Sequence, residues 1–110
     1  MIKYTEMVAG QVLTAAPLTY YTAPASTQAV IHACAVTNPT AAAVVVNLYR
    51  VSSSTVAGAP TRIASRTIPA GQTLSLIDAI NHKLAAGSQL FADGLGCGLN
   101  ISGIEYIPSN

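Results

Sequence analysis

Charge is scarce in this sequence. Asp, Glu, Lys and Arg together make up 8% of the 110 residues, whereas about 25% is typical of a globular domain. No charged residue occurs between Met7 and Tyr49, a stretch of over a third of the chain. Because five basic and four acidic residues almost cancel, the composition favours neither nucleic-acid binding nor repulsion between copies. Such a surface suits a protein that packs against other proteins.

Tryptophan is absent, and the sequence has one phenylalanine and two cysteines. Two cysteines are too few for a disulfide scaffold, and the shortage of large aromatic residues argues against a carbohydrate-binding β-sandwich module. No run of about 20 apolar residues could span a bilayer. The first ten residues lack the apolar run and cleavage site of a signal peptide. We therefore expect no membrane partner and a cytosolic origin.

The residues that dominate are those of β-strands. Val, Ile, Thr and Tyr recur, and Pro, Gly, Asn and Ser interrupt them at short intervals. The expected strands cover residues 11–15, 18–23, 29–37, 43–51, 61–68, 73–77, 88–93 and 98–107. About eight short antiparallel strands with frequent turns predict an all-β fold, a single β-sandwich or jelly roll over residues 1–110. We expect residues 1–25 to form an extended N-terminal arm plus the first strands, and residues 108–110 to form a tail.

The connections carry specific turn signals. NPTA, from Asn38 to Ala41, predicts the turn of a hairpin, and PAGQ at 69–72 predicts a tight turn with Gly71 at its permissive position. Residues 52–60 are expected to form a flexible loop, and Arg62 and Arg66 to face water. DAINHKLA at 78–85 predicts one short helical turn, capped by Asp78 and with Ile80 and Leu84 on one face.

The strand at 29–37 is apolar on both faces. Simple alternation places Val30, His32, Cys34 and Val36 on one face, and Ile31, Ala33 and Ala35 on the other. The strand at 43–51 divides in the same way, with Val44, Val46 and Leu48 against Val45, Tyr49 and Val51. A sandwich strand ordinarily has one wet face, so we expect a partner chain or another element to cover the outer face. The alternative is a plain sandwich, because Ala, Ser and Thr are tolerated in water.

Three candidate sites for chemistry are weak. His32, Cys34, His82 and Cys97 are ligand types for zinc, but they are scattered and do not show the close pairs of structural zinc sites. Cys34, His82 and Asp78 could form a nucleophilic triad by composition alone. GLGCG at 94–98 precedes a strand where a phosphate-binding loop would open a helix, so we expect a hairpin loop. We predict no enzyme activity, no cofactor and no metal.

Three stretches together resemble small β-sandwich structural proteins of tailed bacteriophage particles. They are AVIHACAVTNPTAAAVVVNLYRV, RTIPAGQTLSL and NISGIEYI, within residues 28–107. Such proteins often have Gly-Asp before the next-to-last strand, whereas this chain has Ser88 in AAGSQL. The resemblance implies a virion location after synthesis in the bacterial host cytoplasm, and it carries over no active-site residues.

The resemblance leads to a functional hypothesis. We expect a capsid decoration or cement protein that forms a homo-oligomer, a dimer or trimer, and braces neighbouring major capsid subunits. The alternative is a neck, tail or fibre-attachment component. The segment from Met1 to Thr22 is expected to reach onto neighbouring subunits, because an extended arm can add a strand to a foreign sheet edge. The expected interface residues are Tyr4, Val12, Leu13, Leu18, Tyr20, Tyr21, His32 and Tyr49.

Overall fold

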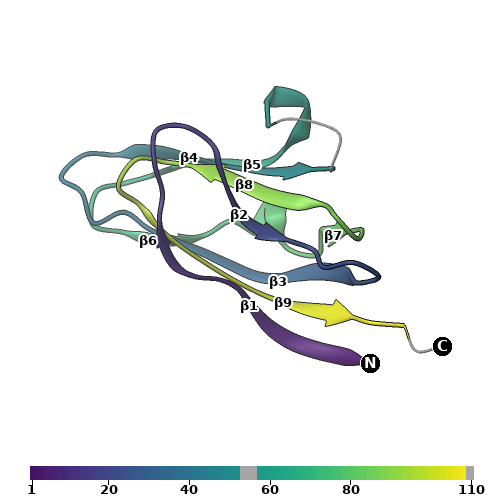
Figure 1. Ribbon diagram of the computed structural model, residues 1–110. Helices are drawn as coiled ribbons and strands as arrows, with labels where there is room; N and C mark the ends of the chain where they lie inside the picture. Colours follow the sequence, from purple (N-terminus) through teal and green to yellow (C-terminus); the bar gives the residue numbers. More distant parts are fainter. Residues whose placement is uncertain (53–56, 109–110) are drawn as a thin grey trace.

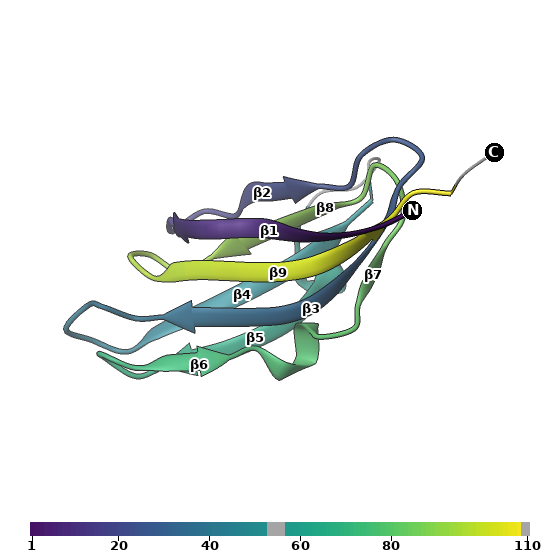
Figure 2. The same ribbon diagram turned by 90° about the horizontal axis from the view of Figure 1, so that it is seen from below.

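The first four strands of the chain alternate between two facing sheets (Figures 1 and 2). The computed structural model describes residues 1–52 and 57–108. The strands of sheet A are β1 (Ile2–Val12), β3 (Gln28–Thr37), β6 (Thr73–Ser75), β7 (Lys83–Leu84) and β9 (Gly98–Tyr106). Those of sheet B are β2 (Leu18–Thr22), β4 (Val44–Val51), β5 (Arg62–Ile68) and β8 (Gln89–Asp93).

The order of the strands defines the fold. Sheet A has the order β1-β9-β3-β6, with β7 also paired to β3, and sheet B has the order β2-β8-β4-β5. Every pairing is antiparallel. A five-stranded and a four-stranded layer connected in this crossed order are a jelly roll. The predicted fold class is confirmed.

Two expected hairpins are instead connections between the sheets. The NPTA turn joins β3 in sheet A to β4 in sheet B, and the loop at 94–97 joins β8 in sheet B to β9 in sheet A. The hairpin prediction was wrong at both places. Turn residues specify that the chain reverses, but they do not specify whether the next strand pairs beside the last one or packs across the core.

Asn38 holds the NPTA connection in place. Its side chain is buried, and its amide nitrogen donates to the carbonyls of Ala42 and Ile68 at 2.8 Å each. Its side-chain oxygen accepts hydrogen bonds from the backbone N–H and the hydroxyl of Thr40. Its backbone also bonds Gln72 and Gly71 in the PAGQ turn, where Gly71 has a φ of 75°. Asn38 therefore holds the NPTA and PAGQ loops together at one end of the sandwich.

A β-bulge in β3 changes the predicted faces of that strand. Ile31 lies opposite Gly103 and Ala33 lies opposite Ser102, so His32 is an extra residue without a partner. Beyond the bulge the alternation shifts by one, which places Cys34 and Val36 in the core with Ile31. In β4 the expected set is correct at Val46 and Leu48, which are fully buried.

The N-terminal segment is extended, but it is paired within its own chain. β1 pairs along its length with β9, and β2 pairs with β8. The helical turn is shorter than predicted, since a single 3₁₀ turn, η2 (Ile77–Ala79), precedes β7 and its N-cap is Leu76 rather than Asp78. Part of the loop predicted at 52–60 lies outside the described residues, and the rest includes a 3₁₀ turn, η1 (Ala59–Thr61). In the described part of the chain, no helix is long and apolar enough to cross a membrane.

Candidate interaction surface

The outer face of sheet A is an uncovered surface built around β9. Alternation along β9 directs Leu99, Ile101, Gly103 and Glu105 into the molecule and Asn100, Ser102, Ile104 and Tyr106 outward. On the neighbouring strands, Tyr4 and Glu6 of β1 and Val30 and Ala33 of β3 share this outer side. We call this surface the sheet A face, defined by Tyr4, His32, Ala33, Ser102, Ile104 and Tyr106.

Two β-bulges meet at the centre of the sheet A face. Ser102 pairs with Glu6 on one side and with Ala33 on the other, while Ile101 pairs with Val8 and Cys34. Met7 is therefore an extra residue between the pairs at Ser102 and Ile101, and His32 is an extra residue between the pairs at Gly103 and Ser102, so the two bulges flank Ser102. Met7 turns inward and His32 turns outward. Bulges re-aim side chains, and this pair makes the face concave.

Glycine at position 103 makes this arrangement possible. A Cβ placed there would overlap the sulfur of Met7 and the carbonyl oxygen of Val30. The bulged Met7 therefore occupies the space that a side chain on β9 would need. In NISGIEYI, Ser102 therefore points outward, Gly103 leaves a gap for Met7, and Glu105 points inward.

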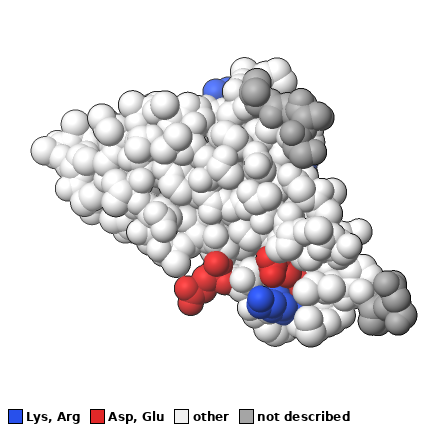
Figure 3. Space-filling view, viewed as in Figure 1, with Lys and Arg blue, Asp and Glu red and all other residues white. Residues whose placement is uncertain are grey.

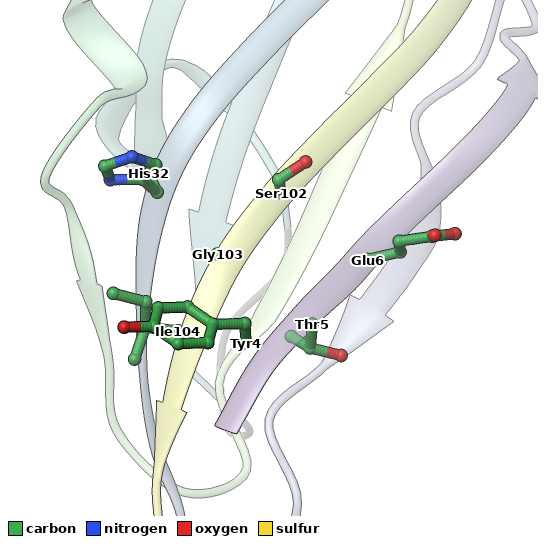
Figure 4. Close-up of a pocket in the computed structure, with 7 residues that line it drawn as sticks. All are labelled: Tyr4, Thr5, Glu6, His32, Ser102, Gly103 and Ile104. Carbon is green, nitrogen blue, oxygen red and sulfur yellow. The ribbon is translucent and has the colours of Figure 1, made fainter. Parts of the chain in front are cut away.

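A hollow of about 280 Å³ lies on the sheet A face. Its lining comes from three strands and is mostly apolar: Tyr4, Thr5, Glu6, His32, Ser102, Gly103 and Ile104. Figure 4 shows Tyr4 reaching from β1 across β9 toward Ile104, while Glu6 points the other way. Tyr4 is 81% exposed and Ile2 beside it is 63% exposed. Large apolar side chains exposed together are typical of interaction sites.

Charge is almost absent from much of the surface. In Figure 3 the visible face is largely uncharged, and its charged atoms lie mainly along the lower side, where β1 and β9 run in Figure 1. The loops at 13–17, 38–43, 69–72 and 94–97 contain no Asp, Glu, Lys or Arg. Backbone hydrogen bonds join these loops in pairs, from Leu13 to Cys97 and Gly96 and from Asn38 to Gln72 and Gly71. These four loops are therefore an uncharged part of the surface.

Positive charge gathers elsewhere. Arg50, Arg62 and Lys83, three of the five basic residues, line a separate hollow of about 470 Å³. Arg50 also donates to the carbonyl of Lys83 at 3.1 Å and so links β4 of sheet B to β7. This grouping could not be predicted from the sequence, because the three residues are far apart along the chain and share no local pattern.

The predicted interface residues divide into two groups. Tyr4, Val12, Leu18 and His32 are exposed. Leu13 is 1% exposed and lies in the core, and Tyr49 is buried with its hydroxyl donating to Asp93 at 2.8 Å. Leu13 and Tyr49 are therefore buried within their own chain.

Tyr20 and Tyr21 close the side of the sandwich where β1 faces β2. A bulge between Thr19 and Tyr21 turns both rings against the core. The hydroxyl of Tyr21 donates to the carboxylate of Glu105 at 2.5 Å, and the hydroxyl of Tyr20 is 3.4 Å from the carbonyl oxygen of Val12. Burial and the nearby Glu105 raise the pKa of Tyr21 well above its ordinary value. These tyrosines join the two sheets of one chain.

The two cysteines lie in the core of the molecule. Cys34 and Cys97 are both buried and free, and burial raises the pKa of the Cys34 thiol to about 12. A thiol with that pKa stays protonated near neutral pH, so Cys34 is unsuited to be a nucleophile. The bulge places His32 outward while Cys34 points inward. Among residues 1–52 and 57–108, no three His, Cys, Asp or Glu side chains cluster to hold a metal ion.

Comparison with known proteins supports the fold. No protein-family model matches the sequence, and no curated protein matches it. A solved chain from work on Bacillus, in which "endospore appendages form a novel family of disulfide-linked pili", has a similar structure with a TM-score of 0.58. The two sequences are 15% identical, and the match covers 98% of this chain and 89% of that one. At this identity the likeness shows a shared fold.

Proposed function

We propose that this protein is a structural subunit that assembles with further copies of itself. The observation that carries the proposal is the sheet A face, an uncovered and hollowed surface with exposed apolar side chains, which lies beside an exposed edge strand. Burying apolar area contributes roughly 25 cal/mol per Å², and low net charge opposes association little.

Two kinds of assembly fit such a subunit. The sequence resemblance to virion proteins of tailed phages supports a decoration or cement protein that braces shell subunits. The structural likeness to a pilus-forming protein supports a filament subunit on a cell or spore surface. In this fold Cys34 and Cys97 are buried, so they do not supply disulfide links between subunits. Contacts made by these surfaces would be non-covalent.

The sheet A face can be tested with a charged substitution. We expect the purified protein to form oligomers in size-exclusion chromatography with light scattering, and Tyr4→Glu to shift it toward the monomer. The matched control is Val45→Glu, since Val45 is 52% exposed on sheet B and should tolerate the charge without losing association. A wild-type protein that stays monomeric at its highest soluble concentration would contradict the proposal.

Copy number separates the two kinds of assembly. The chain should be quantified against the major shell protein in purified phage particles, and located on host cells or spores by immunogold labelling. A ratio near that of the shell protein would support decoration or cement. A ratio that fits one ring per particle would support the neck or tail. Labelled filaments on cells or spores would support the appendage.

A further inference from the structure

The free edge of β1 presents a regular row of unpaired backbone groups. Met1 and Ile107 exchange two hydrogen bonds: the Met1 nitrogen donates to the Ile107 carbonyl, and the Ile107 N–H donates to the Met1 carbonyl. Hydrogen-bonded pairs alternate along an antiparallel ladder, so Lys3 and Thr5 also bond to β9. Ile2, Tyr4 and Glu6 therefore direct their N–H and C=O groups away from β9. In the described part of sheet A, no strand lies on that side.

The other sheet edges are protected or short. On β5, Arg66 lies opposite the inward Val46, and its guanidinium donates to the carbonyl of Ser75 across the gap between the sheets. Inward-pointing charge is a common protection against edge pairing. β2 has five residues and a bulge, and β6 has three residues. β1 has eleven residues and is regular from Ile2 to Glu6, before the bulge at Met7.

Resting on the proposed self-assembly, we propose that β1 pairs antiparallel with β1 of a second copy, in a register centred on Tyr4. Tyr4 then lies opposite the partner's Tyr4, and Ile2 lies opposite the partner's Glu6. Each pair can exchange two N–H···O=C bonds, so every free group from Ile2, Tyr4 and Glu6 finds a partner. The two copies of sheet A become one continuous sheet across a two-fold axis, which is an isologous contact.

The charges on β1 and the face on which each side chain lies favour this register over the registers shifted along the strand. Lys3 points inward opposite Glu105 of its own chain, and it would lie opposite the partner's Thr5. Glu6 would lie opposite an isoleucine. A shift by two residues toward Met1 leaves Glu6 unpaired and places Lys3 opposite the partner's Lys3, which is destabilising. A shift by two in the other direction brings the bulge at Met7 into the pairing.

A proline substitution tests the backbone contact. Tyr4→Pro removes an N–H that points away from β9, so the β1–β9 ladder keeps its bonds, and edge strands tolerate proline in this orientation. We expect Tyr4→Pro to weaken dimerisation at least tenfold with a nearly unchanged urea midpoint. Tyr4→Ala keeps the N–H and should weaken it only a few-fold. Equal loss in both variants, or dimerisation by Tyr4→Pro at wild-type strength, would overturn the edge pairing.

Cross-linking tests the register without changing Tyr4. Directly opposed residues of a hydrogen-bonded pair have Cα atoms about 5.5 Å apart, which is within the range for a disulfide. The Ile2→Cys/Glu6→Cys double variant should form a covalent dimer in most molecules under mild oxidation. Glu6→Cys alone is the control, because two copies of residue 6 would be roughly 14 Å apart.

The outcomes separate the two proposals. Oligomers in chromatography without specific cross-linking of the double variant would reject the β1 register and leave the structural-subunit proposal standing. A wild-type protein without oligomers would reject both.

Discussion

The two sheets are built from similar residues, but the side chains on their outer sides make different contacts. On sheet B, Asp93 accepts hydrogen bonds from Asn47 at 2.9 Å and from Tyr49 at 2.8 Å, so the side chains bond to one another. On sheet A the outer side has a hollow lined by Tyr4 and Ile104, an exposed Tyr106 and an open edge. Sheet B pairs polar side chains on its outer side within the chain, although the side-chain oxygen of Asn47 is buried without a partner. Sheet A leaves apolar area and backbone groups for a partner.

The largest expected effect lies at the bulges that shape sheet A. Gly103→Ala should lower the free energy of unfolding by about 3 kcal/mol, because the added methyl overlaps Met7 and the Val30 carbonyl. Urea denaturation measures the change. Gly98→Ala on the same strand is the control, since a Cβ there meets no atom within 4 Å and should change stability by less than about 0.5 kcal/mol. Equal effects of the two substitutions would mean that Met7 can move aside at little cost.

Removing one tyrosine hydroxyl at a time compares the contact between the two sheets, at Tyr21, with the outer side of sheet B, at Tyr49. Tyr21→Phe should cost about 2 kcal/mol, because it removes the hydroxyl that donates to the buried carboxylate of Glu105. Tyr49→Phe should cost about 1 kcal/mol, because Asp93 keeps its bond from Asn47. Thermal or urea unfolding of both variants decides the order, and a larger cost for Tyr49→Phe would reverse the comparison.

Alkaline pH should weaken the fold through buried groups of both sheets. Burial raises the pKa of Cys34 from 9.0 to about 12, and it also raises the pKa of Cys97, Tyr21 and Tyr49. A raised pKa means that the folded state holds its proton longer than the unfolded state. Stability is then fully present below about pH 9 and falls as the pH rises toward 12.

Two variants test which sheet causes the loss of folding stability at alkaline pH. Cys34→Ala on sheet A should flatten the decline just above pH 9, where an unfolded thiol starts to ionise. Tyr49→Phe on sheet B should act only above about pH 10, the ordinary pKa of tyrosine. Unfolding free energies measured by urea at several pH values give the slopes. An unchanged slope in Cys34→Ala would show that its thiol does not contribute.

The smallest expected effect is at the edge of sheet B. Arg66→Thr removes one exposed hydrogen bond to Ser75 and should cost about 0.5 kcal/mol or less. If Arg66 protects the β5 edge, the variant should also form larger species in light scattering than the wild type does. Unchanged size at equal concentration would mean that β5 is protected by other means.

Much of the architecture could be predicted from residue types. Strand-forming runs between Pro, Gly and Asn signals predicted seven of the main strands close to their observed limits, and the exposed Arg62 and Arg66 were placed correctly. The strand at 2–12 was missed, because its regular part mixes the charged Lys3 and Glu6 with Ile2, Tyr4 and Thr5 and has no apolar face toward the core. Sequence alternation also could not locate the bulges, since an extra residue leaves no local composition signal.

The sequence by itself determined an all-β chain with little charge, because strand propensity and charge are properties of single residues and short windows. Tertiary structure alone decided that β3 and β4 lie in opposite sheets, that Glu105 points inward toward Tyr21 while Ile104 points outward, and that the edge of β1 is open. These features depend on which distant strands become neighbours. One such pair is β1 and β9, which come from opposite ends of the chain and pack together with Met7 in the gap at Gly103.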